Sequence, residues 1–290
     1  MFFLLKNGGN GMEKGLDAIR QRISVRSYAE KEVEPEQRKL LEQLCVKYEN
    51  GGPYRTAVRF RLLDLEPLSS SDLRRMGTYG VIKGARLYIL SAAHSGKGAM
   101  EDLGYCLENI ILGATTLGLG TCWLGGTFKR GAFAAQMELA EDELLPAITP
   151  VGYPAVEKSV TERVMRFGAG SNRRKPWPEL FFKSDGVTAL PESESGTFKE
   201  AYEAVRMGPS ASNKQPWRLL LDQQGVTHLY LKENKIYNRM MGKLRLQLVD
   251  MGIAMCHFEV AARELNLPGA WNTSHKGPRI AGLQHIASWQ

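Results

Sequence analysis

Apolar residues recur at helical spacing in two segments of the chain, residues 102–123 and residues 250–271. In both segments the apolar side chains follow one another at intervals of four, three, four and three residues. The positions are Leu103, Leu107, Ile110, Ala114 and Leu117 in the first segment and Met251, Met255, Phe258, Ala262 and Leu265 in the second. A seam with this heptad spacing lets one helix pack lengthwise on another. The pattern therefore predicts two long helices that can pack together.

The two segments also align with each other without a gap. Identical residues stand at Asp102 and Asp250, Gly104 and Gly252, Ala114 and Ala262, Leu117 and Leu265, Leu119 and Leu267, and Trp123 and Trp271. Two unrelated amphipathic helices would share part of the apolar pattern, but identical residues at both ends favour an internal duplication. We therefore interpret the chain as two related halves.

Strand-like runs complete the layout of each half. Residues 61–64 and 219–222 each end such a run at an Asp, and residues 87–92 and 229–232 are further candidate strands. Each half thus consists of a helix, a loop, a strand, a long helix and further strands, which is a mixed α+β arrangement. If the long helices pack together, the chain imitates a two-fold dimer, and we expect a site where the halves meet.

Composition at the N-terminus and in the middle of the chain suggests the domain boundaries. A short apolar run followed by Gly and Asn, far too short for a signal sequence, predicts a disordered leader over residues 1–11. Residues 181–195 contain Asp-Gly, Pro and a Ser/Glu cluster, which is typical of a linker. We therefore predict a first half over residues 12–185 and a second half over residues 186–290.

Charge and cysteine content narrow the class of protein. The 290 residues carry a formal charge of +7, but the basic residues are scattered and no basic patch with interleaved aromatics is visible, so no nucleic-acid partner is expected. No stretch approaches the length of a membrane span, so no membrane partner is expected either. The four cysteines are far apart and form no CxxC, which favours a reducing cytoplasm and predicts no metal site.

Residues 22–26, Arg-Ile-Ser-Val-Arg, are the first candidate binding segment. In an extended run, Arg22, Ser24 and Arg26 would point one way and Ile23 and Val25 toward the core. Two guanidinium groups flanking a hydroxyl can grip a phosphate. The alternative is a half-buried strand with a solvated basic face, which these five residues alone would favour.

Two loops rich in small residues are further candidates. Residues 208–217, Gly-Pro-Ser-Ala-Ser-Asn-Lys-Gln-Pro-Trp, would let a planar ligand approach the backbone, although Ser and Asn are also common in ordinary turns. Residues 117–126 end the first long helix with Gly residues and continue into a loop whose backbone N–H groups could donate to a ligand. The latter signal is weak by itself, and no dinucleotide-binding fingerprint is present.

A basic cluster, Arg173-Arg174-Lys175-Pro176, precedes a helix-like stretch over residues 177–182. It suits a phosphate, although an isolated basic run is usually a solvated face.

Taken together, these motifs resemble the FMN-dependent nitroreductase family, whose members contain R-x-S-x-R, P-S-x-x-N-x-Q-P-W, G-L-G-T-C-W-I-G, V-G-Y-P and a basic cluster. The matches are residues 22–26, 209–217, 118–125, 151–154 and 173–175. In the family P-S-x-x-N follows R-x-S-x-R closely, whereas here it lies in the second half. The second half in turn lacks R-x-S-x-R and a basic cluster. The chain thus resembles the thermophile-type subfamily in which one chain replaces the dimer.

The resemblance implies an α/β/α sandwich, internally duplicated, with one FMN between the halves. It implies that Arg22, Ser24 and Arg174 hold the phosphate, with Arg173 and Lys175 as further candidates. Arg26 would lie near N1 and O2 of the flavin, and the backbone of Gly125 and Gly126 near N5 and O4. Ser210 and Asn213 would contact the ribityl chain and the ring. At the pyrimidine, where the family often has a polar residue, the contact would come from the backbone of residues 77–80 or from Tyr79. The remaining expected contacts are Gly80, Trp123, Leu124, Pro209 and Ala211.

The resemblance also implies an activity. It suggests ping-pong hydride transfer from NAD(P)H through the flavin to a small-molecule acceptor, such as a nitroaromatic or a quinone. The flavin carries the chemistry, so no catalytic side chain is expected. With both long helices in one chain, we expect a monomer. Two alternatives stay open: a flavin-binding sensor or carrier without efficient turnover, and a degenerate fold that serves as an interaction module. Intact Arg22, Ser24, Arg26 and Asn213 argue against the latter.

Overall fold

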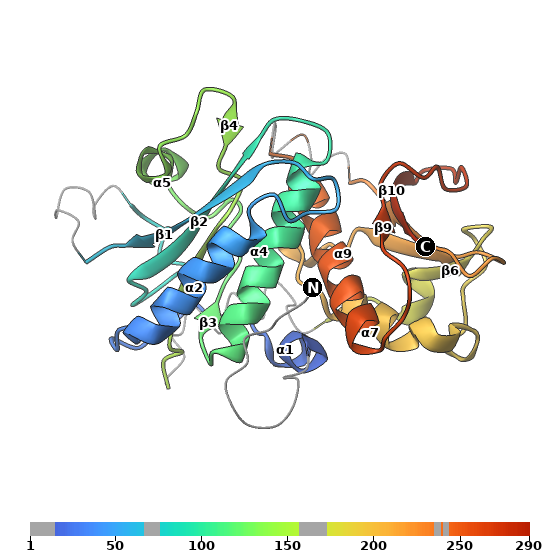
Figure 1. Ribbon diagram of the computed structural model, residues 1–290, viewed down its shortest axis with the longest axis horizontal. Coiled ribbons are helices and arrows are strands. Elements are labelled where there is room, and N and C mark those ends of the chain that lie inside the picture. Colours follow the sequence, from blue (N-terminus) through green and yellow to red (C-terminus); the bar gives the residue numbers. More distant parts are fainter. Residues whose placement is uncertain (1–14, 67–75, 157–172, 235–238, 240–243) are drawn as a thin grey trace.

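The computed structural model describes residues 15–66, 76–156, 173–234, 239 and 244–290. It consists of two β-sheets with helices between them, and two long helices, α4 and α9, lie side by side in the middle (Figure 1). The predicted leader, residues 1–11, and the predicted start of the fold at residue 12 lie outside the described residues.

The first half is covered by helices on both faces of its sheet. Its elements are α1 Gly15–Gln21, α2 Pro35–Tyr48, β1 Val58–Asp64, β2 Leu87–His94, α4 Ala99–Thr116, β3 Gly120–Thr121, α5 Arg130–Met137, β4 Glu143–Leu144 and β5 Ile148–Gly152. The sheet has the order β1-β2-β5-β3, and β4 pairs with β2. Alternate residues of β2 face opposite layers, since Leu87 and Ile89 join the main core under α4 whereas Tyr88 and Leu90 join a second cluster under α5.

The second half has a sheet of the same kind. Its elements are the 3-10 turns η1 Trp177–Glu179, η2 Glu192–Glu194, η3 Gly196–Phe198 and η4 Ala211–Asn213, the helices α7 Lys199–Met207 and α9 Leu246–Glu264, and the strands β6 Phe181–Lys183, β7 Trp217–Leu221, β8 Thr227–Leu231, β9 Trp271–Asn272 and β10 Gln284–Trp289. The order is β6-β7-β8-β10-β9. Helices α7 and α9 cover the face toward the middle of the molecule (Figure 1).

The two sheets confirm the predicted duplication. The order β1-β2-β5-β3 in the first half matches β7-β8-β10-β9 in the second, and all of these pairings are antiparallel. In each half a shorter helix precedes the first of these strands, and the long helix connects the second strand to the short edge strand. The predicted strands at residues 61–64, 87–92 and 229–232 are confirmed within a few residues.

The long helices meet at the two glycines that the alignment had paired. A Cβ added to Gly104 would overlap the carbonyl oxygen of Val249, and one added to Gly252 would overlap the carbonyl oxygen of Glu101. Each glycine therefore lets the backbone of the opposite helix approach to contact distance. The duplicated Gly is thus explained by the crossing of α4 and α9, which joins the two halves.

The predicted linker over residues 181–195 is wrong. Strand β6 pairs in parallel with β7, Phe182 forms a bridge with Ala189, and Leu190 is buried in the core. The apolar side chains of this stretch outweigh its turn residues, because they complete the edge of the second sheet. The helix expected over residues 177–182 is reduced to the single turn η1. The boundary between the halves at residue 185 stays a proposal. Strand β6 precedes this boundary in the sequence but belongs to the second sheet.

Two findings concern the environment of the chain. No helix among the described residues is long and apolar enough to cross a membrane. All four cysteines are buried and free, so none of them forms a disulfide.

We predict that Gly252→Ala destabilises the protein, because the added methyl group meets helix backbone rather than a flexible side chain. Overpacking of this kind typically costs about 1–3 kcal/mol, and a clash with backbone belongs at the upper end. The control is Gly131→Ala in α5, where the added Cβ meets nothing within 4 Å. This change should stabilise by roughly 0.5–1 kcal/mol, as expected for Ala over Gly in a helix. Urea unfolding of both variants measures the difference, and a Gly252→Ala variant as stable as the wild type would contradict the close crossing.

Candidate functional site

Residues 22–26 connect α1 to the edge of the first sheet. The helical hydrogen bonding of α1 extends to Arg22, whose N–H donates to the carbonyl of Ala18, and the N–H of Val25 then donates to Thr121 at the start of the edge. Val25 is buried as predicted, but Ile23 is 47% exposed, so its predicted inward orientation is wrong. The physical reason is that Arg22 still belongs to the turn of α1, so strict alternation begins only after Ile23.

Arg22 is a buried cation. It is 8% exposed, and its Nε and Nη1 atoms have no hydrogen-bond partner in the described part of the chain. Arg174 lies nearby and donates to the carbonyl of Met207 at the end of α7. Burial, and then the charges of Arg22 and Arg206, lower the pKa of Arg174. Several desolvated positive charges thus gather at one place, and such a cluster favours an anion.

The loop after α7 holds the basic cluster in place. Asn213 donates to the carbonyl of Arg173, and the side chain of Gln215 accepts from the N–H of Lys175 at 2.8 Å and also donates to Arg173. The backbone N–H of Gln215 in turn donates to the hydroxyl of Ser210. Two segments far apart in the sequence, residues 173–175 and 210–215, are therefore joined by hydrogen bonds.

The backbone of this loop is strained. Ser212, Asn213 and Gln215 have φ values of 49°, 51° and 47°, in the left-handed region that side chains other than Gly rarely adopt. Three such residues within four positions are costly, and backbone strain of this kind is concentrated at ligand clamps and active sites. The loop is therefore a candidate for ligand contact on the ground of its backbone conformation.

The duplicated Asp residues anchor the corresponding loops of the two halves on the long helices. Asp102 on α4 accepts from the N–H groups of Tyr54 and Thr56 and from the Thr56 hydroxyl. Asp250 on α9 accepts from the N–H of Ala211 at 2.8 Å, and its other oxygen has no hydrogen-bond partner in the described residues. Burial raises the pKa of Asp250 to about 8.

The segment after α4 lies between the halves. The indole N–H of Trp123 donates to Glu108 at 2.6 Å, and Gly125 packs against Leu246 in the first turn of α9, where an added Cβ would lie 2.8 Å from the leucine methyl. Leu124 pairs with Ile148 of β5 and is buried, whereas Gly126 is exposed. Ser24 forms a bridge with Thr121, which places it just before this segment along the sheet edge.

Arg26 has buried polar atoms similar to those of Arg22. Its Nε and Nη1 atoms are buried without a hydrogen-bond partner among the described residues, and its carbonyl accepts from Lys83. The turn at Tyr79 and Gly80 precedes Lys83. Both turn residues have positive φ, and the Tyr79 side chain is 67% exposed.

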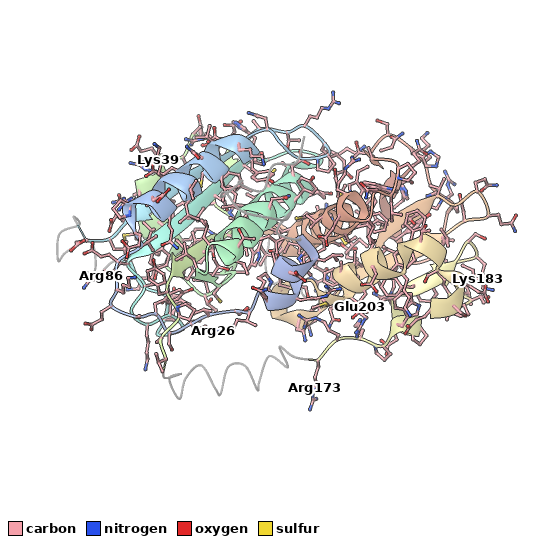
Figure 2. All side chains as sticks on the ribbon, turned by 60° about the horizontal axis from the view of Figure 1, so that its bottom comes forward. Arg26, Lys39, Arg86, Arg173, Lys183 and Glu203 are labelled. Atoms are coloured by element: carbon pink, nitrogen blue, oxygen red, sulfur yellow. The ribbon has the colours of Figure 1, made fainter. Side chains whose placement is uncertain are left out.

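Arg173 differs from Arg174 in where its side chain lies. Figure 2 shows Arg26 and Arg173 on the same side of the molecule, with the Arg173 side chain pointing away from the ribbon. Arg173 therefore contributes its carbonyl to the loop, while its exposed guanidinium lies apart from the buried cations.

Sequence reasoning missed three residues that build this region. Glu108, His257 and Gln215 are all buried, and each bridges segments that are distant in the sequence. Gln215 was part of a motif but was not singled out. The available signal for Glu108 and His257 was an ionisable residue within a helix that is otherwise largely apolar, which predicts a partner but cannot say which one.

The fold and the site together define a duplicated α+β protein in which Arg22 and Arg174 lie close together where the halves meet. The chain matches the family model described as "Putative TM nitroreductase" over residues 15–262. The chain therefore belongs to this nitroreductase family.

The chain is similar to several known proteins, and the first of these similarities shows the fold. The crystal structure of a "putative nitroreductase" from Thermotoga maritima is similar over 98% of this chain and 96% of that chain, with a TM-score of 0.61 and 19% identity. A curated protein from Archaeoglobus fulgidus, named "Putative NADH dehydrogenase/NAD(P)H nitroreductase", is 32% identical over 81 residues, which are 27% of this chain. The match spans 47% of that relative's length. A structure from Desulfovibrio desulfuricans, titled as a putative nitroreductase in complex with FMN, has a TM-score of 0.41 and 23% identity, with 53% of this chain and 96% of that chain covered.

These comparisons confirm the family and the fold class that the motifs implied. The protein has the nitroreductase fold, and the family supports an oxidoreductase. The two matching sheet topologies confirm that the fold is duplicated within one chain.

We predict that Asp250→Asn changes how stability depends on pH. The folded-state pKa of about 8 lies above the ordinary value of 3.8. Between these two pH values, the folded chain keeps a proton on Asp250 that the unfolded chain has lost. The free energy of unfolding of the wild type therefore falls as the pH rises through this range, by at most about 1.4 kcal/mol per pH unit. Asn keeps an oxygen for the Ala211 N–H and does not ionise.

The Asp250→Asn variant should therefore gain stability relative to the wild type as the pH is raised from about 5 to about 8. Chemical unfolding at several pH values measures this difference. The control is Asp17→Asn on the exposed side of α1, which makes the same chemical change where the carboxylate is solvated. A difference between Asp250→Asn and wild type that does not vary with pH would show that Asp250 is ionised in the folded protein.

Proposed function

We propose that the protein is an FMN-dependent oxidoreductase that transfers a hydride from NAD(P)H to a small-molecule acceptor. The observation that carries this proposal is the set of buried guanidinium atoms of Arg22 and Arg26 that have no hydrogen-bond partner among the described residues. Burying a cation without hydrogen bonds is unfavourable in free energy. A ligand that has a phosphate at one end and many hydrogen-bond acceptors along the rest of its length would offset this cost. FMN has both parts.

The residues present fit such a cofactor. Arg22 and Arg174 form the cationic end, where the phosphate would be held, and Ser24 lies on the same segment as Arg22. Arg173 and Lys175 remain candidates for the same end; Arg173 would have to turn its exposed side chain inward. Arg26 would lie at the flavin-ring end of the cofactor. Its positive charge would favour reduction, because the reduced ring carries negative charge.

Contacts to the ring and the ribityl chain would come from both halves. Trp123, Leu124, Gly125 and Gly126 belong to the first half, and the strained loop with Pro209, Ser210, Ala211 and Asn213 to the second. Tyr79 and Gly80 would complete the pyrimidine side. The flavin would supply the hydride chemistry, and the protein would bind it, orient it and set its charge environment. The expected course is ping-pong, with a nitroaromatic or a quinone as acceptor.

A monomer in a reducing compartment is part of the same proposal. The apolar faces of α4 and α9 are covered by each other within the chain, so the surface that would otherwise join two subunits is used internally. Four free, buried cysteines suit the cytoplasm.

We predict one FMN per chain, because the proposed phosphate-binding residues occur only in the first half and the P-S-x-x-N motif only in the second. The purified protein, with FMN added and excess removed, should release about one flavin per chain, bleach with NADPH or NADH, and regain its colour with a quinone. Two flavins per chain would contradict the asymmetric site. A bound flavin that NAD(P)H does not reduce would favour a sensor or carrier, and failure to retain any flavin would refute the proposed function.

We predict that Arg22→Ala weakens FMN binding about tenfold to a hundredfold, since a charge-assisted hydrogen bond typically contributes on the order of 1.5–3 kcal/mol. Fluorescence titration of FMN into the flavin-free chain measures this loss. The matched control is Arg20→Ala, which removes an exposed arginine two residues away that pairs with Asp17 and Glu200. Equal FMN affinity in both variants would assign Arg22 to the support of α1 alone.

A further inference from the structure

A single buried carboxylate, Glu108 in the middle of α4, connects several parts of the proposed site. Its side chain is fully buried. One oxygen accepts from the indole of Trp123 at 2.6 Å, and the other lies 2.8 Å from Nε2 of His257 and 3.6 Å from Nε of Arg22. His257 belongs to α9 and is also fully buried. The cluster therefore spans both halves of the chain.

The hydrogen bonds of His257 determine where protons must lie. Its Nδ1 is 2.8 Å from the carbonyl oxygen of Ala204. A carbonyl only accepts, so Nδ1 carries a hydrogen. At Nε2 a neutral ring would then present a lone pair to the Glu108 oxygen, and two acceptors at 2.8 Å repel each other. The contact between His257 and Glu108 must therefore contain a proton, on one partner or the other.

This proton determines the net charge of the cluster formed by Arg22, Glu108 and His257. With it, the pair of Glu108 and His257 is neutral as a whole, whichever partner holds the proton. The cluster with Arg22 then keeps one net positive charge. Without it, the carboxylate of Glu108 would cancel the charge of Arg22 in a place where burial makes electrostatic interactions strong. An anion beside Arg22 would then be attracted far less.

We propose that Glu108 and His257 are positioning residues for the phosphate-binding end of the site. Glu108 holds the guanidinium of Arg22 in place, and His257 keeps that carboxylate from neutralising it. This inference rests on the proposed function, because it takes the anion at Arg22 to be the phosphate of FMN. The second oxygen of Glu108 holds Trp123, so the same group fixes the start of the segment proposed to contact the ring.

The test compares FMN with riboflavin, which has the same ring and ribityl chain but no phosphate. Both are titrated into the flavin-free full-length chain, and the ratio of their affinities isolates the phosphate. In His257→Gln a neutral amide faces Glu108, which is then an uncompensated carboxylate. We expect FMN affinity to fall by at least about tenfold and riboflavin affinity to change little, since one added charge acts on the phosphate alone.

The double variant Glu108→Gln with His257→Gln separates charge from packing. It removes the uncompensated carboxylate, so FMN affinity should recover most of what His257→Gln loses. A purely structural role for the two residues predicts the opposite, because two buried substitutions should damage the site at least as much as one. The control is Glu259→Gln on α9, where a carboxylate pairs with Arg263 away from Arg22, and its affinity ratio should equal that of the wild type.

The variant Glu108→Gln alone covers the case in which His257→Gln does not fold. With an amide at position 108, Nε2 of His257 can accept from the amide N–H, so the ring needs no second proton and is neutral. Glu108→Gln and the double variant should therefore prefer FMN over riboflavin equally. A further loss of preference in the double variant, or an unchanged preference in His257→Gln, would overturn the inference. A wild-type chain that binds riboflavin as tightly as FMN would instead refute the proposed function.

Discussion

The crossing of α4 and α9 is the constraint on which the other features of the molecule depend. Each helix brings its own sheet, and Gly104 and Gly252 allow the two backbones to touch. Because the helices are this close, Glu108 on one can reach His257 on the other, and Gly125 can pack against the first turn of α9. A wider crossing would separate these two pairs. The packing of the two helices therefore determines which groups of the candidate site can meet.

Burial of positive charge explains why this junction is suited to an anion. Arg22 is buried and Arg174 is partly buried, and the charge of Arg22 lowers the pKa of Arg174. Such an arrangement is unfavourable by itself, because each cation loses hydration and faces a like charge. Glu108 compensates only part of it. What remains is a deficit of negative charge and of hydrogen-bond acceptors, and a phosphate supplies both.

Sequence reasoning predicted the features that depend on local periodicity. The heptad spacing of apolar residues predicted the two long helices. The alignment paired Asp102 with Asp250, and these two residues hold equivalent loops. It failed where tertiary contacts override local pattern. Ile23 is exposed because α1 extends one residue further than the alternation assumed, and residues 181–195 form part of a sheet because β7 offers them an edge. Glu108 and His257 could not be paired from sequence, since their contact depends on the exact crossing of two helices.

The two halves also show how a duplicated unit can retain one site. Asp102 holds its loop with three hydrogen bonds, which satisfies the backbone of Tyr54 and Thr56. Asp250 holds the corresponding loop by a single bond to Ala211, and the residues beyond it adopt left-handed conformations. Left-handed residues occur in both loops, at Asn50 and Arg55 in the first as well as in the second. The difference lies in the carboxylates, because one oxygen of Asp250 has no hydrogen-bond partner among the described residues. A loop that is already satisfied has little to gain from a ligand. The asymmetry in hydrogen bonding is thus a physical reason to expect one site per chain, with the cations of one half and the loop of the other, as proposed.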